Sequence, residues 1–402
     1  MWEQCLEKTY KEAPMETNKS YIMHTYNQLP NVFTHGEGLY LVDEQENRYL
    51  DFVAGIAVNA LGYSHQGLRQ ALHKQVDEFL HCSNLYFNDE QLKAAKKITR
   101  ATQMDRVFFC NSGTEAVEAS LKLARKYAKF KGNPERYEII TMKNSFHGRT
   151  LGAISATGQT KYQEGLNPLL PGIKHVEYNN IKALEEAISD KTCGIMMEVI
   201  QGEGGIIAAQ REYIEAARKL CDKNGCVLIF DEVQTGIGRT GEVCAYMHYD
   251  IKPDIIALAK GLGAGVAVGA MLASEEVAKG FKPGDHAATF GGNPLAMSAV
   301  NVVLDHVMSP EFLNHVQAMG AYLSQQLNRL KEEFDSVKEV RGMGLMQGIV
   351  IDGQPSAIVK KTYEKKLLIV GAGSNVIRFV PPLVVQKEHI DICIKTLREV
   401  LL

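Results

Sequence analysis

The sequence predicts an α/β fold in which a large domain with a mainly parallel central sheet is joined to a smaller α+β domain. A strand followed by a helix recurs from about residue 61 to residue 297. Several of the strand segments are apolar at every position, which is typical of parallel strands covered on both faces. Both ends of the chain lack this alternation. We therefore expect residues 61–299 to form the large domain, and residues 1–60 and 300–402 to form the small domain together.

The alternation in the large domain rests on short apolar runs. Residues 106–110 form one such run, and the turn signal Asn111-Ser112-Gly113 separates it from a segment with helical spacing. The other expected strands are at 138–142, 173–178, 194–200, 226–230, 255–259 and 265–273. A helix is expected between two of these strands, and Gly225 would end it. One apolar face of this helix is formed by Tyr213, Ile214, Ala217, Leu220 and Cys221.

The two ends of the chain carry a different pattern. Residues 38–43 and 48–52 read as a hairpin with polar residues in its turn. After Pro294 come long helical patterns, then strands at 340–351 and 376–380, and a last helix from about residue 387. A single α+β domain built from both ends is the simplest arrangement of these elements.

Composition excludes several classes of protein. The chain has 402 residues, of which 45% are apolar and 23% charged, and its formal net charge is −3, so no general attraction to nucleic acid or to an anionic membrane is expected. The eight cysteines show no CxxC spacing, which argues against a disulfide framework. The first seven residues do not resemble a signal peptide, and the longest apolar stretch, at 266–273, is too short to span a membrane. We expect a cytoplasmic protein.

Asp231 is the first candidate for a functional residue. It follows the apolar run 226–230 and should lie at the carboxyl end of a strand, where α/β folds bind their ligands. An Asp in this place can also simply cap the next turn. A third possibility, the metal-binding carboxylate of a P-loop nucleotide-binding protein, requires a GxxxxGK[ST] loop, and the sequence contains none.

Lys260 is the second candidate. It stands between the apolar run 255–259 and the glycine-rich segment 261–265. A lysine in such surroundings either extends its amine to solvent or has a lowered pKa and acts as a nucleophile. The glycines beside it would allow a cofactor to approach the backbone closely.

The third candidate is the segment Ser112-Gly113-Thr114, which stands between a strand and the start of a helix. Free backbone N–H groups at a helix N-terminus bind phosphate, although an ordinary N-cap has the same sequence signature. Taken together, a phosphate site, the carboxylate of Asp231 and the amine of Lys260 are the groups that pyridoxal 5'-phosphate requires. The combination is more specific than any of its parts.

Five segments resemble those of the class-III aminotransferases, in the same order and over nearly the whole chain. They are NSGTEA at 111–116, SFHGRT at 145–150, FDEVQTG at 230–236, LAKGLG at 258–263 and TFGGNP at 289–294. Within the class, residues 55–62 and 378–383 are most similar to enzymes that act on N2-acetyl-L-ornithine. The resemblance implies fold type I of the pyridoxal-phosphate-dependent transferases. It also implies transfer of the terminal amine of acetylornithine to 2-oxoglutarate in arginine biosynthesis, giving N-acetyl-L-glutamate 5-semialdehyde and L-glutamate.

The resemblance further implies a set of cofactor contacts. Lys260 would hold the cofactor as a Schiff base, Asp231 would pair with its ring nitrogen, and Gln234 would bond its ring hydroxyl. Phe146 and Val233 would cover the two ring faces. The phosphate would be held by Ser112, Gly113 and Thr114, with Thr289 reaching over from a second subunit. The last contact implies a homodimer with shared active sites.

Four substrate contacts are implied in the same way. Arg149 corresponds to the arginine that binds the α-carboxylate of the amine donor, although an ordinary surface arginine is the alternative. Glu203 corresponds to a glutamate that covers Arg378 while the donor binds and uncovers it for 2-oxoglutarate. A plain structural salt bridge is the competing interpretation of this pair. Ala288 would line the substrate side. His147 is assigned no role, and the absence of a His/Cys cluster argues against a metal site.

Some positions depart from the family pattern. Val117 replaces a usual asparagine, Ala267 replaces a frequent proline, and Ala287-Ala288 stands where a glycine and a hydroxyl residue are common, so a hydroxyl contact to the substrate is missing. Succinylornithine, free ornithine and 4-aminobutyrate therefore stay open as donors, although the lack of a tyrosine near Gly55 favours an acylated amine. A non-catalytic regulator of the same fold would be expected to lose Lys260 or Asp231, and the chain keeps both.

Overall fold

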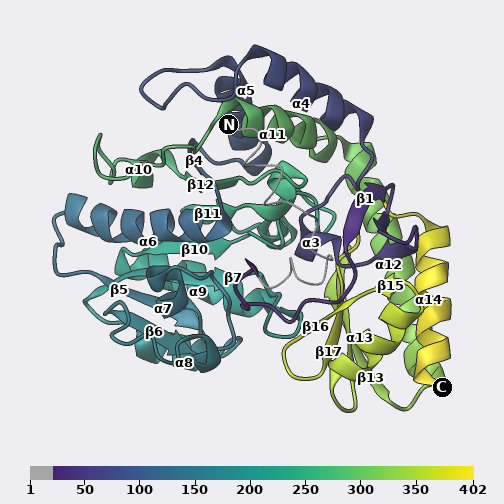
Figure 1. The fold of residues 1–402 in the computed structure, drawn as a ribbon. Helices are drawn as coiled ribbons and strands as arrows, with labels where there is room; N and C mark the ends of the chain where they lie inside the picture. The colour runs from purple at the N-terminus through teal and green to yellow at the C-terminus, as the bar shows by residue number, and fades with distance from the viewer. Residues whose placement is uncertain (1–20) are drawn as a thin grey trace.

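A seven-stranded sheet lies at the centre of the computed structural model, which describes residues 21–402 (Figure 1). The order of the strands is β4-β12-β11-β10-β7-β5-β6, and only β12 runs antiparallel to its neighbours. The bounds are β4 Arg106–Cys110, β5 Glu138–Met142, β6 Ile173–Val176, β7 Thr192–Glu198, β10 Val227–Asp231, β11 Ile255–Leu258 and β12 Gly269–Ala273. The expected mainly parallel sheet is confirmed. The expectation that the first seven residues, Cys5 among them, are not part of a signal peptide concerns residues that lie outside the described range.

Two expected strands differ most from the structure, and the others differ by at most two residues at their ends. The segment expected as a strand at 265–273 begins only at Gly269, because Ala264 (φ 46°) and Gly265 (φ 112°) have left-handed backbone that cannot continue a strand. The single strand expected at 340–351 is a hairpin of β13 (Val337–Met343) and β14 (Met346–Ile351), since Gly344 (φ 56°) turns the chain.

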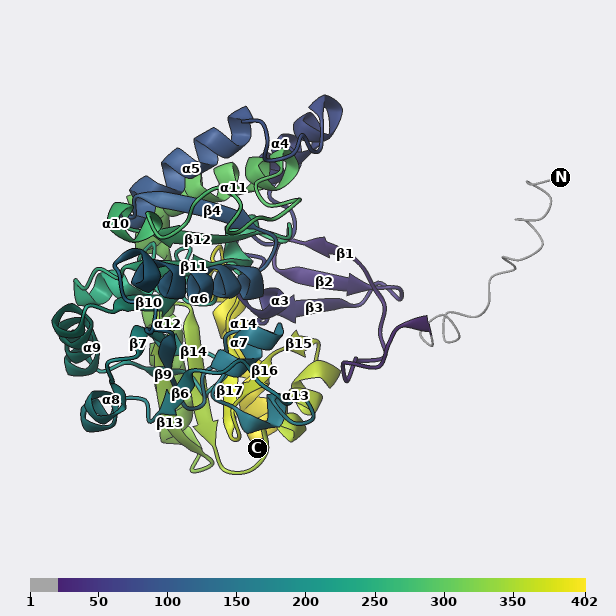
Figure 2. The ribbon, with the colours of Figure 1, turned by 90° about the vertical axis from the view of Figure 1, so that its left-hand side faces the viewer.

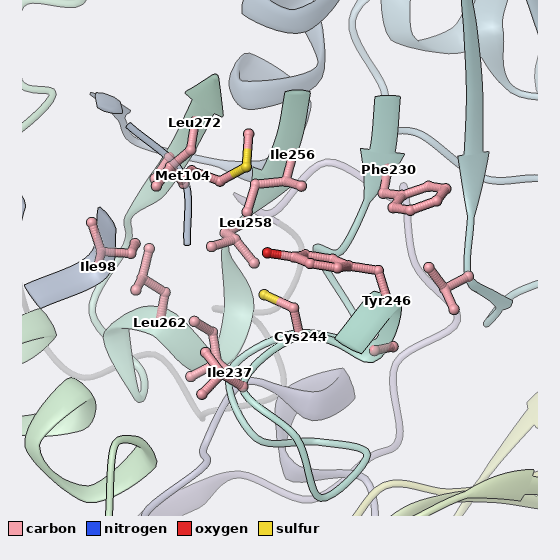
Figure 3. Close-up of a cluster of buried hydrophobic side chains, with 14 of the residues drawn as sticks. Ile98, Met104, Phe230, Ile237, Cys244, Tyr246, Ile256, Leu258, Leu262 and Leu272 are labelled. Atoms are coloured by element: carbon pink, nitrogen blue, oxygen red, sulfur yellow. The ribbon is translucent and has the colours of Figure 1, made fainter. Parts of the chain in front are cut away.

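Both faces of the central sheet are covered, as its apolar strands require. Along β10 and β11, Ile229 and Ala257 pack in one core with α6 (Gly113–Phe130). The alternate residues pack in a second core with α9 (Arg211–Asn224) and α11 (Pro294–Val307). Figure 3 shows part of this second core, in which Phe230, Ile256 and Leu258 lie near Tyr246 and Leu262. Because side chains alternate along a strand, Asp231 shares the face of Ile229, on which α6 lies.

The remaining elements of the larger part are mostly helices. Helix α9 ends at Gly225, which caps it with left-handed backbone (φ 63°) as expected. The other bounds are α3 Ala54–Ala57, α4 Gln66–Glu78, α5 Asp89–Thr102, α7 Leu151–Ala156, α8 Ile181–Ala187, α10 Glu275–Ala278, η2 Thr160–Tyr162, η3 Ala245–Tyr249, η4 Lys260–Gly263, β8 Ile200–Gln201 and β9 Ile207–Ala208. None of the helices within residues 21–402 has the length and apolar run needed to cross a lipid bilayer.

The two ends of the described chain meet in a smaller α+β part. The strands β1, β2 and β3 lie side by side at one edge of the molecule, opposite α8 and α9 (Figure 2), and β3 pairs in parallel with β15 from the C-terminal region. Leu50 and Phe52 share a core with Leu323 and Phe379. The bounds are β1 Phe33–Glu37, β2 Tyr40–Asp43, β3 Arg48–Asp51, β15 Leu367–Leu368, β16 Val370–Ala372, β17 Val376–Phe379, α12 Pro310–Glu333, α13 Pro355–Glu364 and α14 Lys387–Leu401. The domain boundaries at residues 60 and 300 stay a proposal.

Candidate active site

A cavity of about 320 Å³ lies beyond the carboxyl ends of β4, β7, β10 and β11, where ligands are expected in such a sheet. Nearly all of the expected cofactor-binding side chains line it. The lining residues are Val58, Asn111, Ser112, Gly113, Thr114, Phe146, His147, Gly148, Glu198, Asp231, Val233, Gln234, Ala259, Lys260, Gly265, Val266, Ala267 and Val268. The structure thus brings Lys260 and Asp231 together in one small cavity.

The carboxylate of Asp231 is buried and held by two donors. Its Oδ1 accepts a hydrogen bond from the Val233 N–H at 3.0 Å, and its Oδ2 lies 2.7 Å from Nδ1 of His147. His147 is itself buried. Burial lowers the pKa of His147, but its hydrogen bond to Asp231 and the negative charge of that carboxylate outweigh burial and leave the pKa raised. His147 and the Val233 N–H thus hold the Asp231 side chain in place at the wall of the cavity.

From the sequence alone, no role was expected for His147. It stands beside Phe146 in the SFHGRT segment, and 84 residues separate it from Asp231. No local spacing connects the two. The one signal available was that His147 belongs to a segment shared with the family, and such a segment can hold more than one residue that contacts the site.

Lys260 begins the short helix η4 directly after β11, and its backbone is left-handed (φ 45°). A residue other than glycine seldom adopts this conformation, and those that do are frequent at functional sites. Burial lowers the pKa of the Lys260 amine from 10.5 to about 8, with the charges of Glu203 and Arg378 acting on it in opposite directions. An appreciable fraction of such an amine is uncharged at neutral pH.

The N-terminus of α6 forms another wall of the cavity. Ser112 caps the helix, since its hydroxyl accepts a hydrogen bond from the Glu115 N–H at 3.3 Å. The N–H groups of Gly113 and Thr114 have no partner in the helix itself and suit an anion. Gly113 lies directly against Val233, because a Cβ atom built at this position would lie 2.7 Å from Cγ1 of Val233. A side chain at position 113 would displace Val233 from the cavity wall.

Arg149 lies just outside the cavity. Its guanidinium carbon lies 5.5 Å from the ring centre of Phe146 and 4.2 Å from that of Tyr162. The side chain is exposed, and no acidic residue pairs with it within residues 21–402. A guanidinium fixed over two rings with its N–H groups free is suited to bind a carboxylate.

Glu203 and Arg378 form an ion pair behind the cavity, with 2.5 Å between Oε1 and Nη1. Arg378 is only 1% exposed and also donates to Oε1 of Gln234 at 3.0 Å. Burial raises the pKa of Glu203, but the charge and hydrogen bond of Arg378, with smaller effects of Lys260 and Gln234, together outweigh burial and leave the pKa lowered. Because Gln234 lines the cavity, the pair lies one side chain away from the space beside Lys260.

Ala288 and Thr289 are the expected site residues that this single chain does not place beside Lys260. Both line a neighbouring cavity of about 960 Å³ together with Asn84, Phe87 and Phe108. Thr289 is exposed. No cluster of His, Cys, Asp or Glu side chains that could hold a metal ion occurs in the described part of the chain.

Comparison with known proteins identifies the family. The family model for "Aminotransferase class-III" matches residues 21–401. The chain belongs to the class-III aminotransferases. It is similar to an acetylornithine aminotransferase of Caldanaerobacter subterraneus subsp. tengcongensis, with 53% identity over 95% of this chain and 98% of the relative. It is also similar to a succinylornithine transaminase of Citrobacter koseri, with 44% identity over 93% of each chain.

The fold agrees with this assignment. The crystal structure of the ornithine aminotransferase from Toxoplasma gondii ME49 is similar to this chain with a TM-score of 0.92 and 31% identity, over 96% of this chain and 94% of the other. The expected family, its fold type I and the class of enzyme, an aminotransferase, are therefore confirmed.

Proposed function

We propose that this aminotransferase moves the terminal amine of N2-acetyl-L-ornithine to 2-oxoglutarate, giving N-acetyl-L-glutamate 5-semialdehyde and L-glutamate in arginine biosynthesis. The observation that carries the proposal is a single cavity that is lined by both Lys260 and Asp231. The close similarity to an acetylornithine aminotransferase supports the choice of donor.

Pyridoxal 5'-phosphate is the cofactor that these residues fit. Lys260 supplies an amine for its aldehyde, Asp231 an acidic partner for its ring nitrogen, and Gln234 a partner for its ring hydroxyl. The free N–H groups of Gly113 and Thr114 suit the phosphate, and Ser112 holds that helix end in place. When bound, the cofactor serves as an electron sink for the carbon that carries the transferred amine.

The chain's own groups have distinct tasks in this chemistry. With a pKa of about 8, Nζ of Lys260 can take up and return a proton near neutral pH. The Asp231 carboxylate, kept in place by His147, would favour a protonated ring nitrogen in the cofactor. Phe146 and Val233 line the cavity and would exclude water from the two faces of the ring.

Two arginines would bind the substrate carboxylates. The exposed fork of Arg149 would hold the α-carboxylate of the amine donor. Arg378, covered by Glu203, would become available to 2-oxoglutarate when Glu203 swings away. The two substrates would then use one site in turn, which predicts ping-pong kinetics.

A homodimer with shared sites belongs to the same proposal. Leu85 and Phe87 are 84% and 87% exposed and line the cavity that contains Ala288 and Thr289, and Phe290 beside them is 60% exposed. A second copy covering this face would bury these side chains and bring its Thr289 towards the phosphate and its Ala288 towards the substrate. We also keep a cytoplasmic location as a proposal, which the free state of all seven described cysteines supports.

Succinylornithine is the second candidate donor, because one relative of 44% identity is a succinylornithine transaminase. The test is the rate of glutamate formation from 2-oxoglutarate with acetylornithine, succinylornithine, ornithine or 4-aminobutyrate as the donor. We expect the highest kcat/KM with acetylornithine. A higher value with another donor would replace the proposed substrate, and no glutamate with any donor would support the alternative of a non-catalytic regulator.

A further inference from the structure

Glu198 is a buried carboxylate in the cavity wall to which neither the sequence nor the proposed function assigns a task. It ends β7 and is 5% exposed. In the register of the sheet it lies directly beside Asp231 of β10. Two neighbouring buried carboxylates repel each other, so a glutamate in this position requires specific partners.

The two oxygens of Glu198 bind two different segments of backbone. Oε1 accepts a hydrogen bond from the Phe146 N–H at 2.9 Å, and Oε2 accepts one from the Gly202 N–H at 3.0 Å. Phe146 provides an aromatic wall of the cavity, and Gly202 directly precedes Glu203. One side chain therefore holds the aromatic wall and the loop of the Glu203–Arg378 pair at a fixed separation.

The loop around Gly202 is packed so closely that its position determines that of Glu203. A Cβ atom built on Gly202 would lie 2.6 Å from Oε1 of Gln234, the same oxygen that accepts a hydrogen bond from Arg378. Gly202, Glu203, Arg378 and Gln234 thus form a closed ring of contacts, and Glu198 attaches this ring to the cavity wall.

We propose that Glu198 is a positioning residue that stabilises the closed Glu203–Arg378 pair and thereby sets the preference of the site between the amine donor and 2-oxoglutarate. The inference rests on the proposed function, because it assigns the closed pair to the donor half-reaction and the open pair to 2-oxoglutarate. Glu198 acts through Phe146 and Gly202 and touches neither substrate.

The ionised form of Glu198 accepts both hydrogen bonds, whereas protonation turns one oxygen into a donor and weakens the bond that this oxygen accepts. Burial raises the pKa of Glu198 to about 7; the nearby charge of His147 lowers it, and that of Asp231 raises it. Lys260 and Tyr178 also face it, the latter through a hydrogen bond to the Glu198 carbonyl at 2.7 Å. Acidification through pH 7 should therefore release Phe146 or Gly202.

The substitution Glu198→Gln tests the proposal, since the amide keeps the shape but has a single accepting oxygen. Loss of a hydrogen bond to a charged group changes a rate or equilibrium constant that depends on it by about tenfold or more. We expect kcat/KM for the donor half-reaction to fall about tenfold further than kcat/KM for the 2-oxoglutarate half-reaction. Glu177→Gln is the matched control, because Glu177 is exposed and its ion pair is with Lys143. Equal losses in both half-reactions, or no loss, would overturn the proposal.

A second measurement does not depend on turnover. Protection of backbone amides against hydrogen exchange, corrected for the intrinsic effect of pH, is compared in the holoenzyme at residues 144–148 and 200–205. In the wild type, protection of at least one of the two segments should fall from pH 8 to pH 6; in Glu198→Gln protection of that segment should be low at both pH values. Protection that does not change with pH in the wild type would overturn the proposal, even if the variant failed to fold. A wild type that transfers no amine but shows this exchange pattern would contradict the proposed function alone.

Discussion

Nδ1 of His147 lies 2.7 Å from Oδ2 of Asp231, and both side chains are almost completely buried although 84 residues separate them. The histidine arrives from the segment before α7, and the aspartate ends a central strand. Without His147, the Asp231 side chain would keep only the Val233 N–H as a donor. A buried charge with one donor either takes up a proton or moves, and either change would weaken its interaction with a ring nitrogen.

The first prediction concerns this pair. His147→Leu should lower kcat for acetylornithine about 10- to 100-fold, which is the usual weight of a hydrogen bond to a charged group. The measurement is the single-turnover rate at saturating donor, with cofactor binding followed in parallel. His35→Asn, at an exposed position, is the control. If His147→Leu turned over at the wild-type rate, His147 would have no positioning role.

The second prediction concerns Arg149. Arg149→Lys keeps the positive charge but loses the planar fork, so KM for acetylornithine should rise about tenfold while kcat changes little. Arg48→Lys is a matched control, because Arg48 also lies over a tyrosine ring, that of Tyr40, but does not line the cavity. Steady-state kinetics with both substrates gives the result. Unchanged KM values would make Arg149 an ordinary surface residue.

The third prediction separates a switch from a structural salt bridge. Glu203→Gln removes the charge that covers Arg378, so the donor half-reaction should slow about tenfold while the 2-oxoglutarate half-reaction keeps its rate. Arg378→Ala should mainly harm the 2-oxoglutarate half-reaction. The two half-reactions are measured separately from the absorbance of the bound cofactor. Equal damage to both in each variant would indicate a structural pair only.

The fourth prediction concerns stability in acid. Nδ1 of His65 caps α4 by accepting from the Leu68 N–H, and Nδ1 of His306 donates to the Val302 carbonyl. Their Nε2 atoms lie 3.1 Å apart, so only a neutral pair with His65 as the donor satisfies all three contacts. Burial, with a smaller effect of His306, lowers the pKa of His65 from 6.5.

Because the pKa of His65 is lower in the folded protein than in the unfolded chain, the neutral His65–His306 pair stabilises the fold fully above pH 6.5. This stabilisation is lost as the pH falls from 6.5 through the pKa of His65 in the folded protein. The wild type should therefore lose about 1 kcal/mol, the weight of one N-cap, between pH 7 and pH 5. His65→Asn keeps a capping oxygen that does not titrate and should show a smaller loss. Thermal unfolding at both pH values provides the measurement, and identical losses would count against the pair.

Much of the cavity could be predicted from the sequence because its residues follow strands. Asp231 and Lys260 each come directly after an apolar run, and the carboxyl ends of parallel strands meet at one edge of a sheet. The segment 112–114, expected to bind phosphate, could be predicted because it also follows an apolar run, that of β4. The apolar runs themselves are strong signals, because both faces of these strands are buried.

Long-range contacts could not be predicted in this way. Glu198 could not be recognised as a site residue, because it falls within the segment 194–200 that was expected to be one apolar strand. Only the register between β7 and β10 shows that it lies beside Asp231. The partners of His147 and of Glu198 depend on how loops pack, which no local periodicity encodes. The hairpin at Gly344 was missed because a turn of two residues interrupts the apolar pattern too briefly.

The central claim is that the Lys260 amine, in a cavity shared with Asp231, holds the cofactor. Reduction of the purified holoenzyme with borohydride fixes the cofactor to the amine that carries it, and mass spectrometry of the peptides locates it. We predict a pyridoxyl group on Lys260, and its absence from the Lys260→Ala protein. A pyridoxyl group on a different lysine of the wild type, or on none, would contradict the account.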